Sequence, residues 1–440
     1  MLPYTAVLVA ALSLTACAGP GSAPVAEGPP QGVAPRANPD AAPARYVNAR
    51  WYAADAGGVR FEEGERCQVG GVFVAACPAK AAVVDLGGAF VIPPLGEAHN
   101  HNLDGPWTAP MGQRYLADGV FFMKNTNSVN SIDVWAAAAW ETPDTVDIAW
   151  THAGLSVDEG HPEKLYRSIA DVYRLDPEKL EGEVFWDMAD VAALEAKWPD
   201  VLATEPDWIK LYLLDVGQEV SEDASGLTAD VFRAAAARAR ADGIPTTVHV
   251  YTAADYALAV EAGADEAAHL PPTFLRKSDY EQNPDLYTIT PDLAARAAAA
   301  GFVTTTTTLV NERGSMTASP LYEETRRVQA ANLMALKAAG ARLAVGSDRY
   351  RDTGLDEALN LASLGPFTTE EVLRLAVETP RLAIFRDRAI GTLAPGWEAS
   401  FVATRCDPRE DLTCIRDATH RVKQGLLLSI KDRSGEGPEQ

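Results

Sequence analysis

The stretch "VFRAAAARARADGIPTTVHV" (Val231–Val250) contains the unit that decides the fold. Its first part is an alanine-rich run typical of a helix, and this run ends at Gly243, the residue type that best tolerates the positive φ found just past a helix end. A short run of apolar and β-branched residues follows at once, as expected of a buried strand. The stretch therefore predicts a helix followed directly by a strand, with His249 at the strand's end.

The same unit recurs further along the chain. "AADYALAVEAG" precedes "ADEAAHL", "DLAARAAAAG" precedes "FVTTTTTL", and "ANLMALKAAG" precedes "ARLAVGSD". Upstream, the candidate strands are "FVIPPLGEAHNH", "GVFFMKNT", "VDIAWTHAG" and "DWIKLYLLD". Eight strands interleaved with helices between about residues 90 and 348 predict an α/β protein of the (β/α)8 TIM-barrel type. A doubly wound open sheet is the alternative, but no glycine-rich phosphate loop follows the first candidate strand.

Polar residues mark the ends of these candidate strands, where the chemistry of such a barrel is found. In "HNH" the two histidines are spaced i, i+2, so their side chains share one face of the strand. Taken singly, each polar residue also fits an ordinary role, such as a surface histidine or an aspartate that caps a helix. Their recurrence on five strands favours a metal site, because imidazole and carboxylate groups suit zinc or a similar divalent ion. The candidate ligands are His99, His101, Lys210, His249, His269 and Asp348.

Loops that follow the strands supply candidate substrate-binding residues. His152 ends the third strand, His161 follows in the next loop, Tyr251 comes two residues after His249, and Arg349 follows Asp348. Each could orient a substrate carbonyl or carboxylate, and each could equally be an ordinary loop residue. The run "TTTTT" in the seventh strand is interpreted as filling of the barrel, because β-branched residues suit strands.

Composition and charge limit the partners of the protein. The chain has 440 residues, of which 47% are hydrophobic, and this content is typical of a globular protein with a sizeable core. Its net charge of −23 argues against a nucleic-acid partner, because no basic stripe is available to replace phosphate counterions. The oligomeric state stays open.

The N-terminus is typical of an export signal. "LPYTAVLVAALSLTAC" is an apolar run too short to span a bilayer, and its last four residues, Leu14–Cys17, resemble a bacterial lipobox. We expect a signal peptide over residues 1–16, lipidation at Cys17 and a flexible tether over residues 17–45. The protein would then lie in the bacterial cell envelope on the periplasmic side, held on a membrane surface by its lipid anchor. An ordinary secretory signal is the alternative.

Four further cysteines fit an oxidising compartment. Cys67 and Cys77 flank a Gly-Gly turn, while Cys406 and Cys414 flank a turn that contains Pro and Asp. Each pair is local enough to close on itself, so two small disulfide loops are predicted. Four free thiols or a zinc site are the alternatives.

Taken together, these motifs resemble those of the binuclear-metal type of the amidohydrolase superfamily. The resemblance rests on the histidines of "EAHNH", the lysine of "DWIKLY", the histidines of "TTVHVY" and "EAAHLP", and the aspartate of "AVGSD". The tail "VLRLAVETPRLAIF" and the later "AIGTLAPGWEASFVA" are similar to the closing helix and turn of that superfamily. The imidazolonepropionase-like and prolidase-like branches are nearest. "HVYTAAD" and "AAHLP" depart from their usual motifs, so the identity of the substrate does not transfer.

The resemblance implies two divalent metal ions, expected to be zinc. His99, His101 and Asp348 would hold one metal and His249 and His269 the other, while Lys210, carboxylated by CO2, would bridge them. A hydroxide that bridges the metals would attack the substrate, and Asp348 would be the catalytic proton carrier. The implied enzyme is a metal-dependent hydrolase that cleaves an amide, cyclic amide or peptide-like C–N bond of a small-molecule substrate. An esterase or lactonase, a deaminase, and a non-catalytic surface lipoprotein are the alternatives.

The resemblance also implies the domain boundaries. The hydrolase barrel is expected over residues 93–384, and a tail over residues 431–440. The β-type flanks, residues 46–92 and 385–430, are expected to pair into one small β-sandwich domain beside the barrel.

Overall fold

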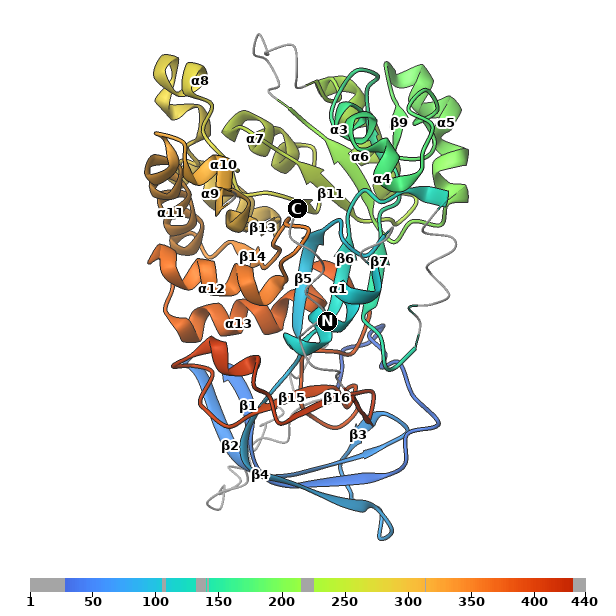
Figure 1. Ribbon diagram of the computed structural model, residues 1–440, viewed down its shortest axis with the longest axis vertical. Helices are drawn as coiled ribbons and strands as arrows, with labels where there is room; N and C mark the ends of the chain where they lie inside the picture. Colours follow the sequence, from blue (N-terminus) through green and yellow to red (C-terminus); the bar gives the residue numbers. More distant parts are fainter. Residues whose placement is uncertain are drawn as a thin grey trace, which may run out of the picture.

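The computed structural model describes residues 28–104, 108–131, 140, 142–214, 225–312 and 314–429. The predicted signal peptide, the lipidation site Cys17 and the tail over residues 431–440 therefore lie outside the described residues. The chain forms an α/β body and, beside it, a smaller sheet (Figure 1). Within the described ranges, no helix is long and apolar enough to cross a membrane.

The α/β body contains two sheets of parallel strands. The first has the order β5-β6-β7, and the second has the order β14-β13-β12-β11-β10-β8-β9. The strands are β5 (Leu95–Asn100), β6 (Val120–Asn125), β7 (Asp147–Trp150), β8 (Gly154–Ser156), β9 (Phe185–Asp187), β10 (Ile209–Tyr212), β11 (Thr246–His249), β12 (Glu266–Ala267), β13 (Val303–Thr305) and β14 (Arg342–Ala344). Adjacent strands in these two sheets pair in parallel throughout. This is the α/β fold with parallel strands that the sequence predicts.

Backbone hydrogen bonds join both edges of the three-stranded sheet to the seven-stranded one. The amide of Ala98 in β5 donates to the carbonyl of Val345 just after β14, at 2.8 Å. At the other edge, the amide of Asp207 just before β10 donates to the carbonyl of Trp150 at the end of β7, at 2.9 Å. The strands that carry the candidate ligands are therefore held in one continuous arrangement.

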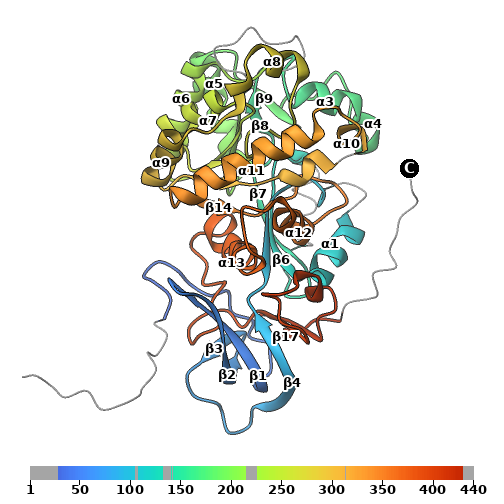
Figure 2. The same cartoon turned by 90° about the vertical axis from the view of Figure 1, so that its left-hand side faces the viewer.

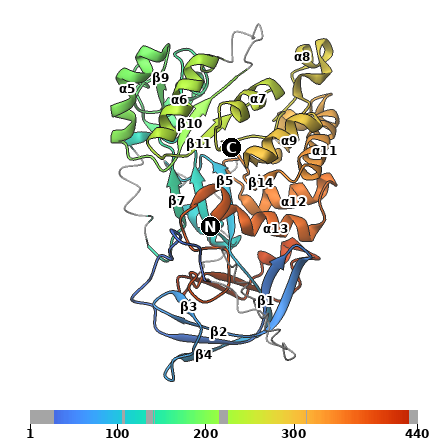
Figure 3. The same cartoon turned by 180° about the vertical axis from the view of Figure 1, so that it is seen from behind.

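Helices flank these strands, as Figures 2 and 3 show from the side and from behind. The α-helices are α1 (Thr108–Ala117), α3 (Glu163–Ser168), α4 (Ala170–Tyr173), α5 (Val191–Ala203), α6 (Ala229–Ala241), α7 (Ala253–Glu261), α8 (Lys277–Gln282), α9 (Pro291–Ala300), α10 (Gly314–Thr317), α11 (Tyr322–Ala338), α12 (Gly354–Leu364) and α13 (Thr369–Thr379). Short 3-10 turns are η2 (Pro284–Tyr287), η3 (Thr308–Glu312) and η5 (Leu412–Ile415), and a π-helical turn is η4 (Pro380–Ile384). The main core lies between the strands and these helices, and it includes Phe121, Trp198 and Phe232.

The opening stretch of the sequence folds as predicted. Thr228 caps α6 by accepting a hydrogen bond from the amide of Val231, and the chain turns at Gly243 with φ +75° before entering β11. A glycine is favoured there because a side chain would be strained at that φ. Helix, turn and strand therefore follow one another as the local pattern indicates.

The third candidate strand differs from its prediction. "VDIAWTHAG" contains β7 and reaches only the first residue of β8, and the two strands are separated at His152, whose φ of +54° breaks the extended backbone. Similarly, β14 ends at Ala344, so Asp348 lies on the loop beyond the strand with φ +47°. Left-handed backbone of this kind is not signalled by apolar periodicity, which is why the sequence pattern placed both residues at strand ends.

Strands from both flanks of the chain form a second, seven-stranded sheet with the order β17-β16-β15-β4-β1-β2-β3. They are β1 (Ala44–Asp55), β2 (Gly58–Val69), β3 (Val72–Val74), β4 (Ala82–Ile92), β15 (Phe401–Thr404), β16 (His420–Lys423) and β17 (Leu426–Leu427). The antiparallel pairing of β15 with β4 joins the C-terminal flank to the N-terminal one. The flanks therefore share one sheet, while the β-sandwich and the domain boundaries remain predictions.

Two disulfides lie in these flanks. Cys67 is bonded to Cys77 with a Cα–Cα distance of 5.3 Å, and Cys406 to Cys414 with a Cα–Cα distance of 6.1 Å. Each bond closes a short local loop, ten and eight residues apart in sequence.

Candidate metal centre

A carboxylate lies among three imidazoles at the carboxyl ends of the parallel strands. Oδ1 of Asp348 is 3.3 Å from Nε2 of His101 and 3.7 Å from Nε2 of His99. Its other oxygen, Oδ2, is 3.8 Å from Nδ1 of His269. One ligand atom from each of His99, His269 and Asp348 lies within 4.8 Å of the other two, a spacing that could hold a metal ion.

A fourth imidazole extends this cluster toward β11. The ring centroids of His249 and His269 are 4.5 Å apart, the same separation as between His99 and His269. His249 also faces Tyr212 across the pairing of β10 with β11. The candidate histidines from β5, β11 and the segment just after β12 therefore lie at one place.

Lys210 is buried in β10 opposite Thr247 of β11, two register positions before the pair that Tyr212 forms with His249. Its side chain is 1% exposed, and Nζ has no hydrogen-bond partner within the described part of the chain. Burial lowers the pKa of Lys210 to about 7, against a smaller opposing effect of the nearby Asp348 carboxylate. The amine is therefore available to lose its proton near neutral pH.

The backbone at Asp348 is strained but held on its upstream side. Its φ of +47° lies in the left-handed region, where a residue other than glycine is stable only if its surroundings fix it. The amide of Asp348 donates to the carbonyl of His99 at 2.8 Å, and the preceding Ser347 donates from both its amide and its hydroxyl to Glu97. The backbone at Asp348 is thus tied directly to β5, the strand that carries His99 and ends just before His101.

The residues present fit a divalent cation. Burial is the largest cause that lowers the pKa of His99 and His249 well below the usual range and that of His269 to about 3, so these imidazoles are neutral, the form that binds metals. Both ring nitrogens of His99 are buried and have no hydrogen-bond partner among the described residues. A buried donor or acceptor left unsatisfied is unfavourable, and a metal ion would satisfy one of these nitrogens.

The threonine run that the sequence predicts to fill the barrel also contains a residue that contacts a candidate ligand. Thr307, from the run "TTTTT", has φ +41°, and its Oγ1 is 3.0 Å from Nδ1 of His269. A hydrogen bond of this kind fixes the ring and its tautomer, so Thr307 orients a candidate ligand and does more than fill the core. The threonine run alone could not indicate this, because only the positive φ turns the side chain toward His269.

Of the predicted substrate-binding residues, His161 lies against the cluster. Its ring centroid is 5.1 Å from that of His249 and 5.3 Å from that of Tyr212, and burial lowers its pKa to about 4. Five of the seven histidines of the chain therefore gather at this site.

The other three predicted substrate-binding residues have further contacts. His152 stacks on Trp150 with an interplanar angle of 9°. The hydroxyl of Tyr251 donates to the carbonyl of Phe274 at 2.8 Å. Nε of Arg349 is 3.0 Å from a carboxylate oxygen of Asp352 on its own loop. Their role toward a substrate remains a prediction.

Comparison with known proteins adds to this geometry. Residues 218–423, a range that contains His249, His269 and Asp348, match the amidohydrolase family. No curated protein sequence matches the chain.

Solved structures with a similar fold include three hydrolases. A prolidase complexed with N-methylphosphonate-L-proline has a TM-score of 0.68 at 16% identity, covering 88% of this chain and 100% of its own. Ochratoxinase from A. niger has a TM-score of 0.67 at 14% identity, covering 88% and 96%. Molinate hydrolase has a TM-score of 0.69 at 16% identity, covering 89% and 95%. The family match over residues 218–423 agrees with the amidohydrolase resemblance of the sequence motifs, and the solved structures show that the chain shares their fold.

Proposed function

We propose that the protein is a metal-dependent hydrolase that cleaves the C–N bond of an amide, a cyclic amide or a peptide-like substrate. The observation that carries this proposal is the Asp348 carboxylate, which lies 3.3–3.8 Å from ring nitrogens of three histidines. The match to the amidohydrolase family and the fold shared with a prolidase support the same reaction class.

The scaffold of this enzyme would be a (β/α)8 barrel. The hydrogen bonds that join both edges of the three-stranded sheet to β10 and β14 of the other sheet support a closed ring of strands, and most of the candidate ligands lie at or just after the carboxyl ends of those strands. The seven-stranded flank sheet would belong to a small β-sandwich domain beside the barrel.

Six residues would hold two divalent ions, with zinc the expected metal. His99, His101 and Asp348 would bind one ion, and His249 and His269 the other. When bound, such ions lower the pKa of a coordinated water toward neutrality and polarise a substrate carbonyl.

Lys210 would join the two ions after reaction with CO2. A lysine whose pKa lies near 7 is substantially neutral at physiological pH, so its nitrogen can form a bond to the carbon of CO2 and release one proton. The product is an anionic carboxylate on Nζ. This carboxylate would bring oxygen ligands to the buried end of the Lys210 side chain, where Nζ has no hydrogen-bond partner among the described residues.

Asp348 and His161 would act on the substrate. Asp348 is 16% exposed at its side chain, so it can accept a proton at Oδ1 or Oδ2 and return it to the leaving nitrogen as the C–N bond breaks. His161, neutral because of its lowered pKa, would donate a hydrogen bond to the substrate from one ring nitrogen. His152, Tyr251 and Arg349 would complete the substrate pocket.

The protein would act in the bacterial cell envelope on the periplasmic side, anchored by lipid at Cys17. The apolar N-terminal run and the Leu14–Cys17 motif support this location, and the two disulfides in the flanks suit an oxidising compartment. A Cys17→Ala variant should move from the membrane fraction to the soluble periplasmic fraction. Retention of the variant on the membrane would contradict lipid anchoring at this residue.

Metal analysis of purified protein, paired with a substrate screen, tests the proposed reaction. The wild type should contain close to two metal equivalents and hydrolyse a member of a panel of N-acyl amino acids, dipeptides and cyclic imides, with lactones included to detect an esterase. Lys210→Ala should lose metal and activity together, while Lys277→Ala, at an exposed lysine of α8, should lose neither. A wild-type protein without metal, or a Lys210→Ala variant with unchanged metal content and turnover, would contradict the proposal.

A further inference from the structure

A five-residue loop joins the candidate metal centre to helix α12. It runs from Asp348 to Asp352 and is called the Asp348 loop here. Two asparagines, one at the end of β5 and one just beyond it, hold its backbone: Nδ2 of Asn100 donates to the carbonyls of Arg349 and Asp352 at 2.8 and 3.2 Å, and Nδ2 of Asn102 donates to that of Tyr350 at 3.2 Å. The side of the loop nearest the histidines is therefore fixed by β5 and by the residues that follow it.

The far end of the loop is fixed at Thr353, the N-cap residue of α12. Its amide donates to Oδ2 of Asp356 at 2.9 Å, and its hydroxyl donates to Oδ2 of Asp118 at 2.9 Å. Asp118 is fully buried. The position of this end of the loop therefore depends on where two aspartate carboxylates are held.

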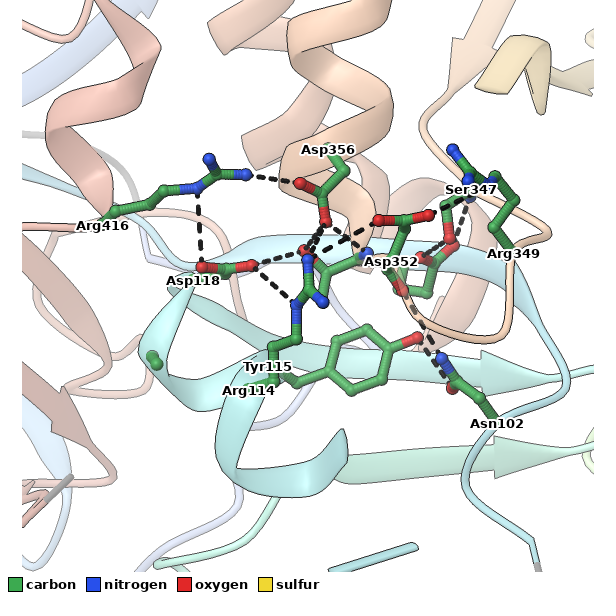
Figure 4. A network of polar contacts seen from close by, with 12 residues as sticks. Asn102, Arg114, Tyr115, Asp118, Ser347, Arg349, Asp352, Asp356 and Arg416 are labelled. Atoms are coloured by element: carbon green, nitrogen blue, oxygen red, sulfur yellow. Dashed lines mark hydrogen bonds and ion pairs between the residues drawn. The ribbon is translucent and has the colours of Figure 1, made fainter. Parts of the chain in front are cut away.

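Two arginines hold those carboxylates, as Figure 4 shows. Nη2 of Arg114 is 3.0 Å from Oδ2 of Asp356 and 3.6 Å from Oδ1 of Asp352, while its Nε is 3.8 Å from Asp118. Arg416 donates from Nη2 to Oδ1 of Asp356, and its Nε is 3.8 Å from Oδ1 of Asp118.

Arg416 comes from a different part of the chain from the rest of this network. It lies in the C-terminal flank, directly after η5 and two residues beyond Cys414 of the second disulfide. Its own backbone is fixed, because its carbonyl accepts a hydrogen bond from Nη2 of Arg421 at 2.9 Å. A side chain that starts from a fixed point and reaches both carboxylates can set where Thr353 lies.

The charges of the network balance only when Arg416 is present. The network contains three arginines and three aspartates that pair with one another: Arg114, Arg349, Arg416, Asp118, Asp352 and Asp356. Without Arg416, one negative charge would be left over beside the buried Asp118, and like charges in a low-dielectric environment repel. The carboxylates would separate and Thr353 would lose at least one of its two fixed acceptors.

We propose that Arg416 is a positioning residue for Asp348. It holds the far end of the Asp348 loop, so the strained left-handed backbone at Asp348 keeps its carboxylate among His99, His101 and His269. The placement of Asp348 stands on the described geometry alone. Only the link from that placement to metal binding rests on the proposed function.

Hydrogen exchange of the metal-free protein tests the positioning directly, since it requires neither metal nor substrate. In Arg416→Met, which keeps most of the side-chain volume but removes the charge, we expect backbone amides of residues 348–353 to exchange at least tenfold faster than in the wild type. The matched control is Arg409→Met: Arg409 lies in the same flank, but it pairs with Asp407 and contacts the ring of Phe61, away from the loop. Its loop amides should exchange within twofold of the wild-type rates.

Arg416→Lys keeps the positive charge but cannot bind two carboxylates in the same forked way, so it should give an intermediate rate. Equal loop exchange in Arg416→Met and Arg409→Met would overturn the proposal. If Arg416→Met does not fold, the lysine variant decides, because loop exchange equal to that of the wild type would then overturn it.

A second measurement follows the effect into the metal centre. We expect Co²⁺ bound to Arg416→Met to show an altered visible absorption spectrum and to leave for a chelator about tenfold faster than from Arg409→Met. An unchanged spectrum and release rate, in a variant whose loop exchanges faster, would overturn the link to Asp348. A wild-type protein that binds no Co²⁺ or Zn²⁺ would contradict the proposed function, and the exchange rates would still decide the role of Arg416.

Discussion

Replacing Lys124 by methionine should destabilise the protein strongly, because it breaks a fully buried ion pair. Nζ of Lys124 lies 2.5 Å from Oε2 of Glu266, and both side chains are 0% exposed. The ammonium also donates to the carbonyl of Ala383 at 2.9 Å and lies 3.9 Å from the centroid of the Trp208 ring. In the variant, the Glu266 carboxylate would keep only weaker, neutral donors, of which the hydroxyl of Thr305 at 2.7 Å is nearest.

The expected loss follows from these contacts. A hydrogen bond to a charged group contributes about 1.5–3 kcal/mol, and a desolvated cation–π contact contributes about 2 kcal/mol. Removing the ammonium also removes its own desolvation penalty, so the net loss should lie at the measured cost of breaking a buried pair, about 3–5 kcal/mol. In a chain of 440 residues that corresponds to a fall in Tm of about 4 °C, at about 1 °C per kcal/mol.

Urea unfolding followed by circular dichroism measures this loss, with two matched variants. Lys124→Met/Glu266→Gln should recover at least half of it, because removing both partners leaves no uncompensated buried charge. Lys277→Met, at a lysine 69% exposed at its side chain, should change stability by no more than about 0.5 kcal/mol. If Lys124→Met lowers the free energy of unfolding by less than about 1 kcal/mol, the reasoning is refuted, because the buried pair would then contribute no more than an ordinary surface ion pair.

Three further predictions concern other buried features. Gly154→Ala would place Cβ 2.6 Å from the ring of Tyr212 and 3.1 Å from Cγ of Lys210. The free energy of unfolding should therefore fall by about 1–3 kcal/mol. The metal content should fall as well, and both quantities can be measured on purified protein. Burial raises the pKa of Glu357 to about 7 from an unfolded value of 4.5, so its contribution to stability is complete below pH 4.5 and is lost as the pH rises through 7. Between pH 5 and 8 the free energy of unfolding, measured in urea, should therefore fall by about 3 kcal/mol more in the wild type than in Glu357→Gln. Parallel plots of unfolding free energy against pH for the two proteins would contradict this. Cys67→Ser opens a loop of ten residues and should lower stability by about 3 kcal/mol on the loop-entropy scale, which equal urea midpoints would contradict.

Local patterns in the sequence predicted the repeating part of the fold. An alanine-rich run that ends at glycine and continues into β-branched residues fixes a helix, a turn and a strand through neighbouring residues alone, as α6 and β11 show. The i, i+2 spacing of His99 and His101 likewise depends only on the geometry of one strand, and their rings lie 5.1 Å apart in the structure.

Features that depend on distant parts of the chain could not be predicted in this way. The left-handed backbone at His152 and Asp348 departs from the period of a strand, so the pattern gave no sign of it. Asn100 looks like a spacer between two histidines, yet its amide bonds to Ser347, 247 residues away. Arg416 has no local motif at all, and its importance follows only from the tertiary contact that brings the C-terminal flank to α12.

The pairing of β15 with β4 also sets an order of events during synthesis. The hydroxyl of Thr404 donates to the carbonyl of Phe90, which is synthesised 314 residues earlier. One edge of β4 therefore has no partner strand while the α/β body is made. An unpaired strand edge is a template for association with other chains. This edge therefore stays without its partner until residues 401–404 have been made, and a chain truncated before residue 401 should aggregate through β4.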